Sequence, residues 1–214
     1  MSAAAPTPDQ IVDHVVYAAP DLDAAVADLG ARLGVRPAYG GSHPGAGSHN
    51  ALLDLGDGAY LEIIAPDPGQ PDPAGRRRPF GLDELDTPRL VGWAAKATDL
   101  EARVAAARAR GFDPGEARTM RRRRPDGVEL VWTLTRGGPA AGGLVPFLID
   151  WGDAPHPAAT APIGCRLTAL AGRHPRPAEV ETALAALGLA LPVEEGPAAL
   201  LATLDTPNGV VRLT

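Results

Sequence analysis

The sequence is poor in cysteine, lysine and aromatic residues. Cys165 is the single cysteine, so no internal disulfide can form, and we expect a reduced residue in the core. Aromatic residues make up only 4% of the chain, so a core must be built mainly from Ala, Leu and Val. Lys96 is the only lysine beside many arginines, alanines, glycines and prolines, which indicates a GC-rich bacterial genome.

Excess positive charge and long apolar runs are also missing. The formal net charge is −6, which disfavours a general nucleic-acid binder. No apolar run reaches the roughly 18 residues that a membrane span needs. Residues 1–10 have neither a basic start nor an apolar stretch, so we expect a disordered tail, no export signal and a cytoplasmic protein. The 45% of hydrophobic residues is enough for a real core.

The stretch from Ile11 to Gly34 predicts a strand that leads directly into a helix. Alternation places Val12, His14 and Val16 on one strand face. Asp21 is a candidate N-cap for an apolar-periodic run that ends at Gly34. We therefore expect one histidine on the inner face of the first strand.

The same pattern returns 78 residues later, where Val91 takes the place of Asp13. In this second copy Asp99 matches the helix cap, and Gly92 stands where the first copy has His14. A match through strand, cap and helix indicates a duplicated unit.

Each unit then continues with further strands. Residues 51–55 and 59–64 read as a hairpin about Gly56-Asp-Gly58, and Glu62 shares a face with Tyr60 and Ile64. We predict an α+β fold of repeated βαβββ modules. The predicted divisions are a tail at 1–10, a first module at 11–65, a linker or lid at 66–88, a second module at 89–152, a linker at 153–161 and a probable third module at 162–214.

These motifs resemble a known group of proteins. Asp13-His-Val-Val at the start of a strand, Pro20-Asp-Leu at a helix start, Gly47-Ser-His-Asn50 and Tyr60-Leu-Glu-Ile are similar to the glyoxalase-like branch of the vicinal-oxygen-chelate superfamily. The resemblance implies that the modules form a cupped, incomplete mixed β-barrel with helices outside. It also implies a divalent metal in the cup, bound by residues of the first and fourth strands of each module.

Carried over by position, the resemblance assigns His14 and Glu62 as metal ligands. An imidazole with a carboxylate suits Fe, Mn, Ni or Zn, and a metal cation would compensate the burial of Glu62. Gly92 supplies no ligand. On the closing strand, one register places Ile149 opposite Glu62, and a slip of one residue places Asp150 there.

Further side chains are candidates for the same cup. His43 and His49 are candidates to complete the ligand set, and His43 is also a candidate substrate contact, although histidines in a glycine-rich loop are often solvated. The Asn50 amide could hold a substrate oxygen. Tyr60 is a candidate substrate contact, and Trp93, Trp132 and Trp151 would line the cup or belong to the core. Glu62 is also the candidate catalytic base.

Two runs of arginine leave alternatives open. In Arg121-Arg-Arg-Arg124 two side chains face each way, and one pair either meets an anionic substrate or is exposed on a hairpin. Arg76-Arg-Arg78 is either solvated or part of a lid.

The leading hypothesis is a metalloenzyme that acts on a small oxygenated substrate by isomerase, lyase or dioxygenase chemistry. The alternative is a metal-free protein that binds or sequesters a small molecule in the same cup. The odd number of modules indicates a possible homodimer, because each half-cup needs a partner.

Overall fold

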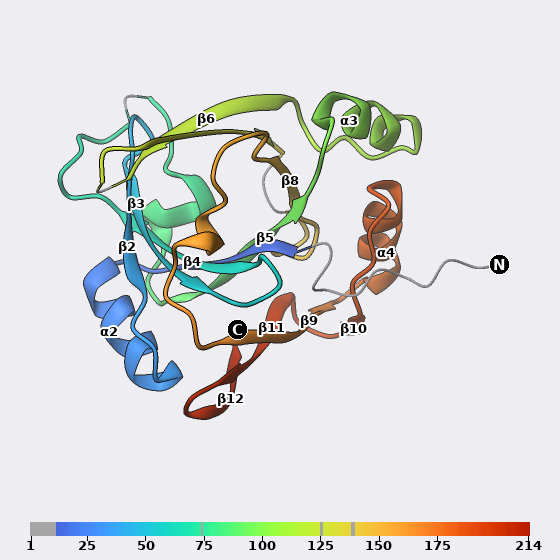
Figure 1. The fold of residues 1–214 in the computed structure, drawn as a ribbon. Helices are drawn as coiled ribbons and strands as arrows, with labels where there is room; N and C mark the ends of the chain where they lie inside the picture. Colours follow the sequence, from blue (N-terminus) through green and yellow to red (C-terminus); the bar gives the residue numbers. More distant parts are fainter. Residues whose placement is uncertain (1–11, 74, 125, 138–139) are drawn as a thin grey trace.

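The structure is a computed structural model that describes residues 12–73, 75–124, 126–137 and 140–214. The tail predicted at 1–10 and Ile11 of the first predicted strand lie outside the described residues. The described chain has an α+β fold in which one mixed sheet curls into a barrel, as predicted (Figure 1).

The first half of the barrel comes from one run of elements. These are β1 (Val12–Ala18), α2 (Leu22–Leu33), β2 (Ala38–His43), β3 (Ser48–Asp54) and β4 (Tyr60–Pro66). The Asp21 carboxylate accepts a hydrogen bond of 2.8 Å from the backbone N–H of Ala24, and α2 ends at Gly34 with φ 75°. Both ends of this helix are therefore set by residues that the sequence identifies.

The second half repeats this succession. Its elements are β5 (Arg89–Lys96), α3 (Leu100–Ala109), β6 (Ala117–Arg123), β7 (Glu129–Thr135) and β8 (Phe147–Asp150). The Asp99 carboxylate caps α3 by accepting a hydrogen bond from the backbone N–H of Ala102 at 3.3 Å. The first two repeats thus have matching caps as well as matching strands.

The strands follow one another around the barrel in the order β1-β4-β3-β2-β6-β7-β8-β5. The first strands of the two halves, β1 and β5, pair antiparallel along most of their lengths. On the other side, β2 meets β6 through the single register pair Ser42 and Arg123. The barrel is therefore firmly joined at one seam and barely closed at the other, and α2 and α3 lie outside it (Figure 1).

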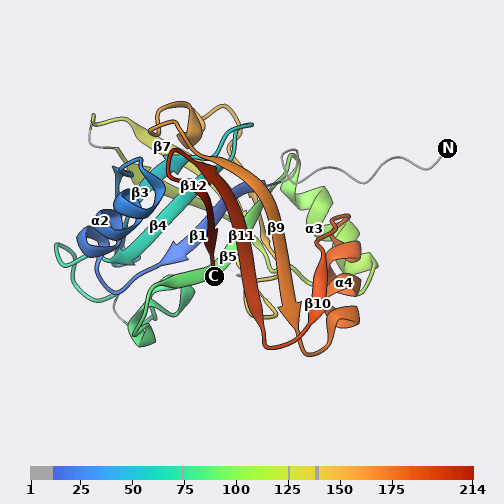
Figure 2. The ribbon, with the colours of Figure 1, turned by 90° about the horizontal axis from the view of Figure 1, so that it is seen from below.

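The third segment has the same succession of elements but another strand order. It consists of β9 (Arg166–His174), α4 (Pro177–Ala186), β10 (Val193–Glu195), β11 (Ala199–Thr206) and β12 (Gly209–Leu213). These strands form a separate sheet in the order β10-β9-β11-β12, seen as its own layer in Figure 2. Here β9 pairs in parallel with β10, whereas β1 of the barrel pairs in parallel with β4, the last strand of its half.

This second sheet lies against the outside of the barrel. Gly172 of β9 leaves room for the Leu144 side chain, which a Cβ at that position would meet. The backbone N–H of Leu90 donates to the carbonyl of Thr214 at 3.0 Å. Because the two barrel halves already complete each other, the argument for a dimer from unpaired half-cups does not apply, and the homodimer itself stays a prediction.

A bulge in β1 changes which side chains share a face of this strand. The register against β5 shifts between Val12 and His14. As a result Val12 packs with Val15 and Tyr17 in the outer core, which is the hydrophobic cluster between the barrel strands and the helices and second sheet outside them. Val16 packs inside the barrel. The prediction that Val12 shares the face of His14 and Val16 is therefore wrong, because the extra residue of a bulge breaks the alternation of side chains.

The remaining sequence expectations concern single features. Cys165 is buried and free, and burial raises the pKa of its thiol. Within the described part of the chain, no helix is long and apolar enough to cross a membrane. Two short 3-10 helices, η1 (Pro79–Glu84) and η2 (Pro157–Ala159), lie in the two connections predicted as linkers.

Candidate functional site

The barrel encloses a cavity of about 570 Å³ that side chains from both halves line. Such a volume is typical of small-molecule sites. A buried polar centre of the lining contains His14, His43, Asn50, Glu62 and Arg122, each with less than a tenth of its surface exposed. Burying so many polar groups is costly unless they are bonded to one another, which is what the structure shows.

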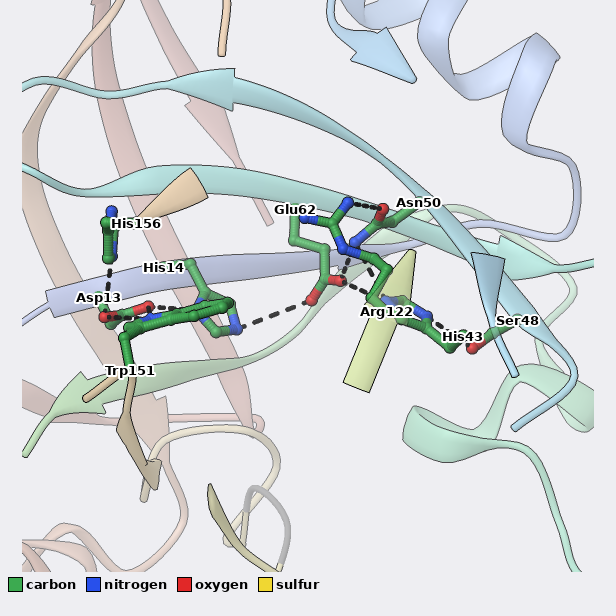
Figure 3. Close-up of polar contacts among 9 residues, drawn as sticks. All are labelled: Asp13, His14, His43, Ser48, Asn50, Glu62, Arg122, Trp151 and His156. Carbon is green, nitrogen blue, oxygen red and sulfur yellow. Dashed lines mark hydrogen bonds and ion pairs between the residues drawn. The ribbon is translucent and has the colours of Figure 1, made fainter. Parts of the chain in front are cut away.

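The Glu62 carboxylate lies at the centre of this group (Figure 3). Asn50 Nδ2 donates to Glu62 Oε1 at 2.6 Å, and Arg122 Nη1 donates to Asn50 Oδ1 at 3.1 Å. The guanidinium can only donate, so it fixes the orientation of the Asn50 amide, with the NH₂ group toward Glu62. Arg122 belongs to the second half of the barrel; burial lowers the pKa of its guanidinium, and the nearby Glu62 carboxylate of the first half acts in the opposite direction.

His43 completes this network as a neutral imidazole. Its Nε2 lies 3.3 Å from Asn50 Nδ2 and 3.8 Å from Glu62 Oε1, and its Nδ1 lies 3.0 Å from Ser48 Oγ. Burial lowers the pKa of His43 to about 4, although the nearby Glu62 carboxylate acts in the opposite direction. Because Nε2 faces an amide donor, we assign the ring proton to Nδ1.

His14 approaches Glu62 from the other side, with 3.7 Å between His14 Nε2 and Glu62 Oε2. Its Nδ1 lies 2.8 Å from Asp13 Oδ1. An ionised carboxylate only accepts hydrogen bonds, so Nδ1 carries the proton and the Nε2 lone pair faces Glu62 and the cavity. The Asp13 carboxylate therefore fixes both the tautomer and the direction of His14.

Asp13 also receives donors from distant parts of the chain (Figure 3). Trp151 Nε1 lies 3.2 Å from both of its oxygens, and His156 Nε2 lies 3.1 Å from Oδ2. Burial by itself raises the pKa of the Asp13 carboxyl, but the hydrogen bonds from His14 and His156 outweigh burial and hold it well below its usual value. Asp13 is therefore an ionised anchor that joins β1 to the connection after β8.

Aromatic and aliphatic side chains form another part of the cavity wall. Tyr60 stacks on His14 with ring centroids 4.7 Å apart, and Phe147 meets His14 edge-on at 5.4 Å. Trp132 and Trp151 lie 5.1 Å apart. Burial and the nearby carboxylates raise the pKa of Tyr60 well above its usual value, so its phenol is neutral.

The structure brings six of the predicted site residues to the cavity and leaves three outside the residues that line it. Those at the cavity are His14, His43, Asn50, Tyr60, Glu62 and Trp132. His49 lies instead beside Asp67, with 4.0 Å between Nδ1 and Oδ1. Asp150 accepts from the backbone N–H of Gly152 at 2.8 Å, and Trp93 is fully buried in the outer core, where Nε1 donates to the Leu144 carbonyl at 2.9 Å.

The register of β8 explains why Asp150 is absent from the lining. Glu62 pairs with Val16 in the first half, and Phe147 pairs with Ala94, the second-half equivalent of Val16. Phe147 therefore takes the position equivalent to Glu62. The two predicted registers, which placed Ile149 or Asp150 there, are both wrong, because β8 is displaced along β5 relative to the sequence alignment.

Four more residues contribute to the site. The sequence indicated no site role for Asp13 or His156, placed Trp151 in the core or the cup lining, and left Arg122 as one of four candidate arginines. The alternation of Arg121 to Arg124 carried a signal for Arg122, but the choice of face depends on how β6 meets β2 across the halves. Asp13 lies at the bulge in β1, where the regular alternation of side chains is broken.

The cavity offers few protein ligands for the divalent metal that the family resemblance implies. His14 and Glu62 supply two donors from the first half, while Gly92 and Phe147 occupy the equivalent places of the second half and supply none. Among the residues that the structure describes, no three His, Cys, Asp or Glu side chains are grouped so that they could hold a metal ion. The residues therefore do not fit a complete protein-held metal site, for which three or four protein ligands are usual.

Comparisons with known proteins agree with this fold. A model of a glyoxalase-like domain family matches residues 12–188, so the chain belongs to this family, within the vicinal-oxygen-chelate superfamily, and the resemblance in the sequence is confirmed. A search of curated proteins found no match.

Solved structures are similar in fold. A hypothetical protein from Staphylococcus aureus has a TM-score of 0.65 at 12% identity, with 94% of this chain and 97% of that chain covered. Methylmalonyl-CoA epimerase from Mycobacterium tuberculosis has a TM-score of 0.43 at 24% identity, with 75% of this chain and 97% of that chain covered. The likeness to the staphylococcal protein covers the third segment as well as the barrel.

Proposed function

We propose that the protein is an enzyme that moves a proton on a carbon next to a carbonyl group of a small oxygenated substrate. This is isomerase or lyase chemistry, with Glu62 as the base. The observation that supports the proposal most strongly is how the two oxygens of the Glu62 carboxylate are placed. Asn50 holds its Oε1 at 2.6 Å, and Oε2 faces the cavity 3.7 Å from His14 Nε2. A positioned carboxylate with one uncommitted oxygen suits proton abstraction.

The neighbours of Glu62 have distinct roles in this proposal. Arg122 orients Asn50, and Asn50 fixes the rotation of the carboxylate. The lone pair of His14 Nε2 can accept a hydrogen bond from a substrate hydroxyl, in a direction set by Asp13. The aromatic wall makes this part of the cavity apolar, and an apolar surrounding strengthens the electrostatic effect of the guanidinium on charge that develops on a substrate oxygen.

The test is exchange of the abstracted proton with solvent. Wild-type protein is incubated in D₂O with a panel of 2-oxo acids, 2-hydroxy acids and dicarbonyl compounds, and deuterium incorporation is followed by NMR. We expect at least one compound to exchange, and Glu62→Gln to slow that exchange by roughly 10²–10⁴-fold. Asp150→Asn is the matched control, because it removes a carboxylate outside the cavity lining. No exchange with any compound, or equal exchange by Glu62→Gln, would contradict the proposal.

A divalent metal held by His14 and Glu62 is the second candidate. The observation that favours it is the Asp13 to His14 hydrogen bond, since metal-binding histidines often donate their other N–H to a carboxylate. Elemental analysis of protein purified without chelator decides the question. Stoichiometric metal that is lost in both His14→Ala and Glu62→Gln would establish this site, and full occupancy in both variants would remove it.

A protein that only sequesters a small molecule is the alternative of another class. The aromatic wall with Trp132 and Trp151 favours binding of a flat apolar compound. Sequestration predicts that compounds bind and are recovered unchanged, without solvent exchange, and that Glu62→Gln has little effect on this binding.

A further inference from the structure

The lining of the cavity has the opposite charge to the rest of the chain. The chain has a formal net charge of −6. Among the described residues that line the cavity, Glu62 is the single carboxylate, and the guanidinium groups are those of Arg76, Arg77, Arg118, Arg121, Arg122 and Arg136. A cavity lined by charge of one sign concentrates ligands of the other sign. The field of this cavity therefore favours anions.

Two of these arginines lie next to each other on one face of the β6–β7 hairpin. Arg118 pairs in register with Leu134, and the backbone N–H of Arg136 donates to the carbonyl of Glu116 at 3.0 Å. Arg136 is thus two residues beyond Leu134, which makes Arg118 and Arg136 diagonal neighbours on the same face. Their Cα atoms are roughly 7–8 Å apart in such an arrangement, close enough for both guanidinium groups to reach one anion.

Glu116 is opposite Arg136 in this register, but it forms no ion pair with Arg118 or Arg136 in the described part of the chain. Arg77, by contrast, pairs with Glu84, and Arg121 Nη1 lies 3.9 Å from Glu129 Oε1. No ion pair is found for Arg118 or Arg136 among the residues that the structure describes, and both side chains are exposed. Two adjacent like charges repel each other unless an anion lies between them. The two guanidinium groups are therefore placed to bind one anion between them.

An apolar surface connects this pair to the polar centre. Arg118, Met120 and Arg122 alternate along one face of β6, and Met120 is opposite Trp132 on β7. Arg118 and Arg122 are four residues apart, which is roughly 13 Å along a strand. Arg122 already donates to Asn50 beside Glu62. A ligand anchored at Arg118 thus crosses Met120 and Trp132 before it reaches Glu62.

We propose that the cavity binds an amphipathic organic anion: its carboxylate or phosphate group pairs with Arg118 and Arg136, its flat apolar body lies on Met120 and Trp132, and its reactive end reaches Glu62. This inference rests on the proposed function for the identity of the reactive end. It goes further in that it names the substrate class and two residues that determine specificity.

The experiment compares ligands that differ only in charge. Isothermal titration calorimetry measures binding of indole-3-acetate and of its neutral analogue indole-3-acetamide, and phenyl phosphate is titrated to separate phosphate from carboxylate recognition. The proteins are wild type, the double variant Arg118→Gln/Arg136→Gln, and the control Arg173→Gln/Arg212→Gln, which removes the same charge from exposed positions of the second sheet.

We expect wild type and control to bind the carboxylate about tenfold more tightly than the amide, as two charge-assisted hydrogen bonds on a partly exposed site allow. In Arg118→Gln/Arg136→Gln the ratio should fall to about one, with binding of the amide unchanged. Equal binding of both indoles by wild type, an unchanged ratio in the double variant, or no binding of either anion at millimolar concentration would overturn the inference.

Glu62→Gln separates this inference from the proposed function. The variant should keep the preference for the carboxylate, because Arg118 and Arg136 lie at the other end of the cavity lining, while it loses solvent exchange. Loss of exchange without any charge preference in wild type would leave the proposed function standing and remove the anion site.

Discussion

The two halves of the barrel have the same succession of elements but contribute different chemistry to one cavity. The first half supplies the acid, the amide and the two imidazoles, namely His14, His43, Asn50 and Glu62. The second half has Gly92 and Phe147 at the places equivalent to His14 and Glu62, and contributes Arg122 and an aromatic wall. A duplicated scaffold can thus keep its architecture while one half provides polar groups that react and the other provides charge and shape.

The largest expected effect on stability is that of Trp93, a residue of the second half that is buried outside the cavity. Trp93 is fully buried, whereas Trp132 of the same half lines the cavity. We expect Trp93→Ala to lower the free energy of unfolding by about 3–5 kcal/mol, since it leaves a void and an unpaired Leu144 carbonyl. Trp132→Ala should cost less stability but weaken ligand binding. Urea denaturation measures the first effect, and a similar loss in both variants would contradict this division of roles.

The second prediction compares neighbouring arginines. Arg122 is buried in the polar network, while the Arg121 side chain is 65% exposed and makes no contact with that network in the described residues. Arg122→Gln should destabilise the protein by about 2–4 kcal/mol, because Glu62 and Asn50 lose a buried charged partner. Arg121→Gln should stay within about 0.5 kcal/mol. If urea denaturation gives the same loss of unfolding free energy for both variants, Arg122 does not stabilise the polar network as described.

The third prediction concerns pH and the first half of the barrel. The pKa of His43 is about 4 in the folded protein and near its usual 6.5 when unfolded, so the unfolded chain binds more protons between these values. Stability should therefore fall as the pH drops from about 6.5 to about 4, with a contribution from His43 of roughly 1–3 kcal/mol.

His43→Gln should flatten this part of the stability curve, measured as the free energy of unfolding at each pH. The hydrogen-bonded Asp13, whose pKa is lowered, adds a loss of stability only at more acidic pH, below about 4. An unchanged slope between pH 6.5 and 4 in His43→Gln would contradict the assignment of a buried neutral imidazole.

The smallest effects are expected at His49 and Asp150, which the sequence proposed as ligands. Both lie outside the cavity lining, beside Asp67 and Gly152. His49→Ala and Asp150→Asn should leave ligand binding unchanged and alter stability by no more than about 0.5 kcal/mol. A marked loss of ligand binding in calorimetry with either variant would show that the residue does contribute to the site, against this prediction.

The sequence was a good guide where local signals decide the structure. Asp21 and Asp99 as caps, Gly34 as a helix end and the hairpin at Gly56-Asp-Gly58 all predict elements that form as expected. His14 and Glu62 converge because β1 and β4 are neighbours in a pattern that the repeat and the family resemblance both indicate.

The sequence was a poor guide where contacts cross between halves. Arg122 approaches Glu62 only because β2 meets β6, and a single register pair defines that meeting. Phe147 replaces a polar residue at the place of Glu62 because β8 is shifted along β5. The third segment has the predicted succession of elements, but its strand order depends on long-range pairing that no local pattern specifies.

The central claim is that the Glu62 carboxylate of one half and the Arg122 guanidinium of the other act as one polar unit through Asn50. A double-mutant cycle tests it directly, with unfolding free energies of wild type, Glu62→Gln, Arg122→Gln and the double variant. The predicted result is a coupling of about 1 kcal/mol or more, with the double variant less damaged than the sum of the single losses. Additive losses would contradict the claim.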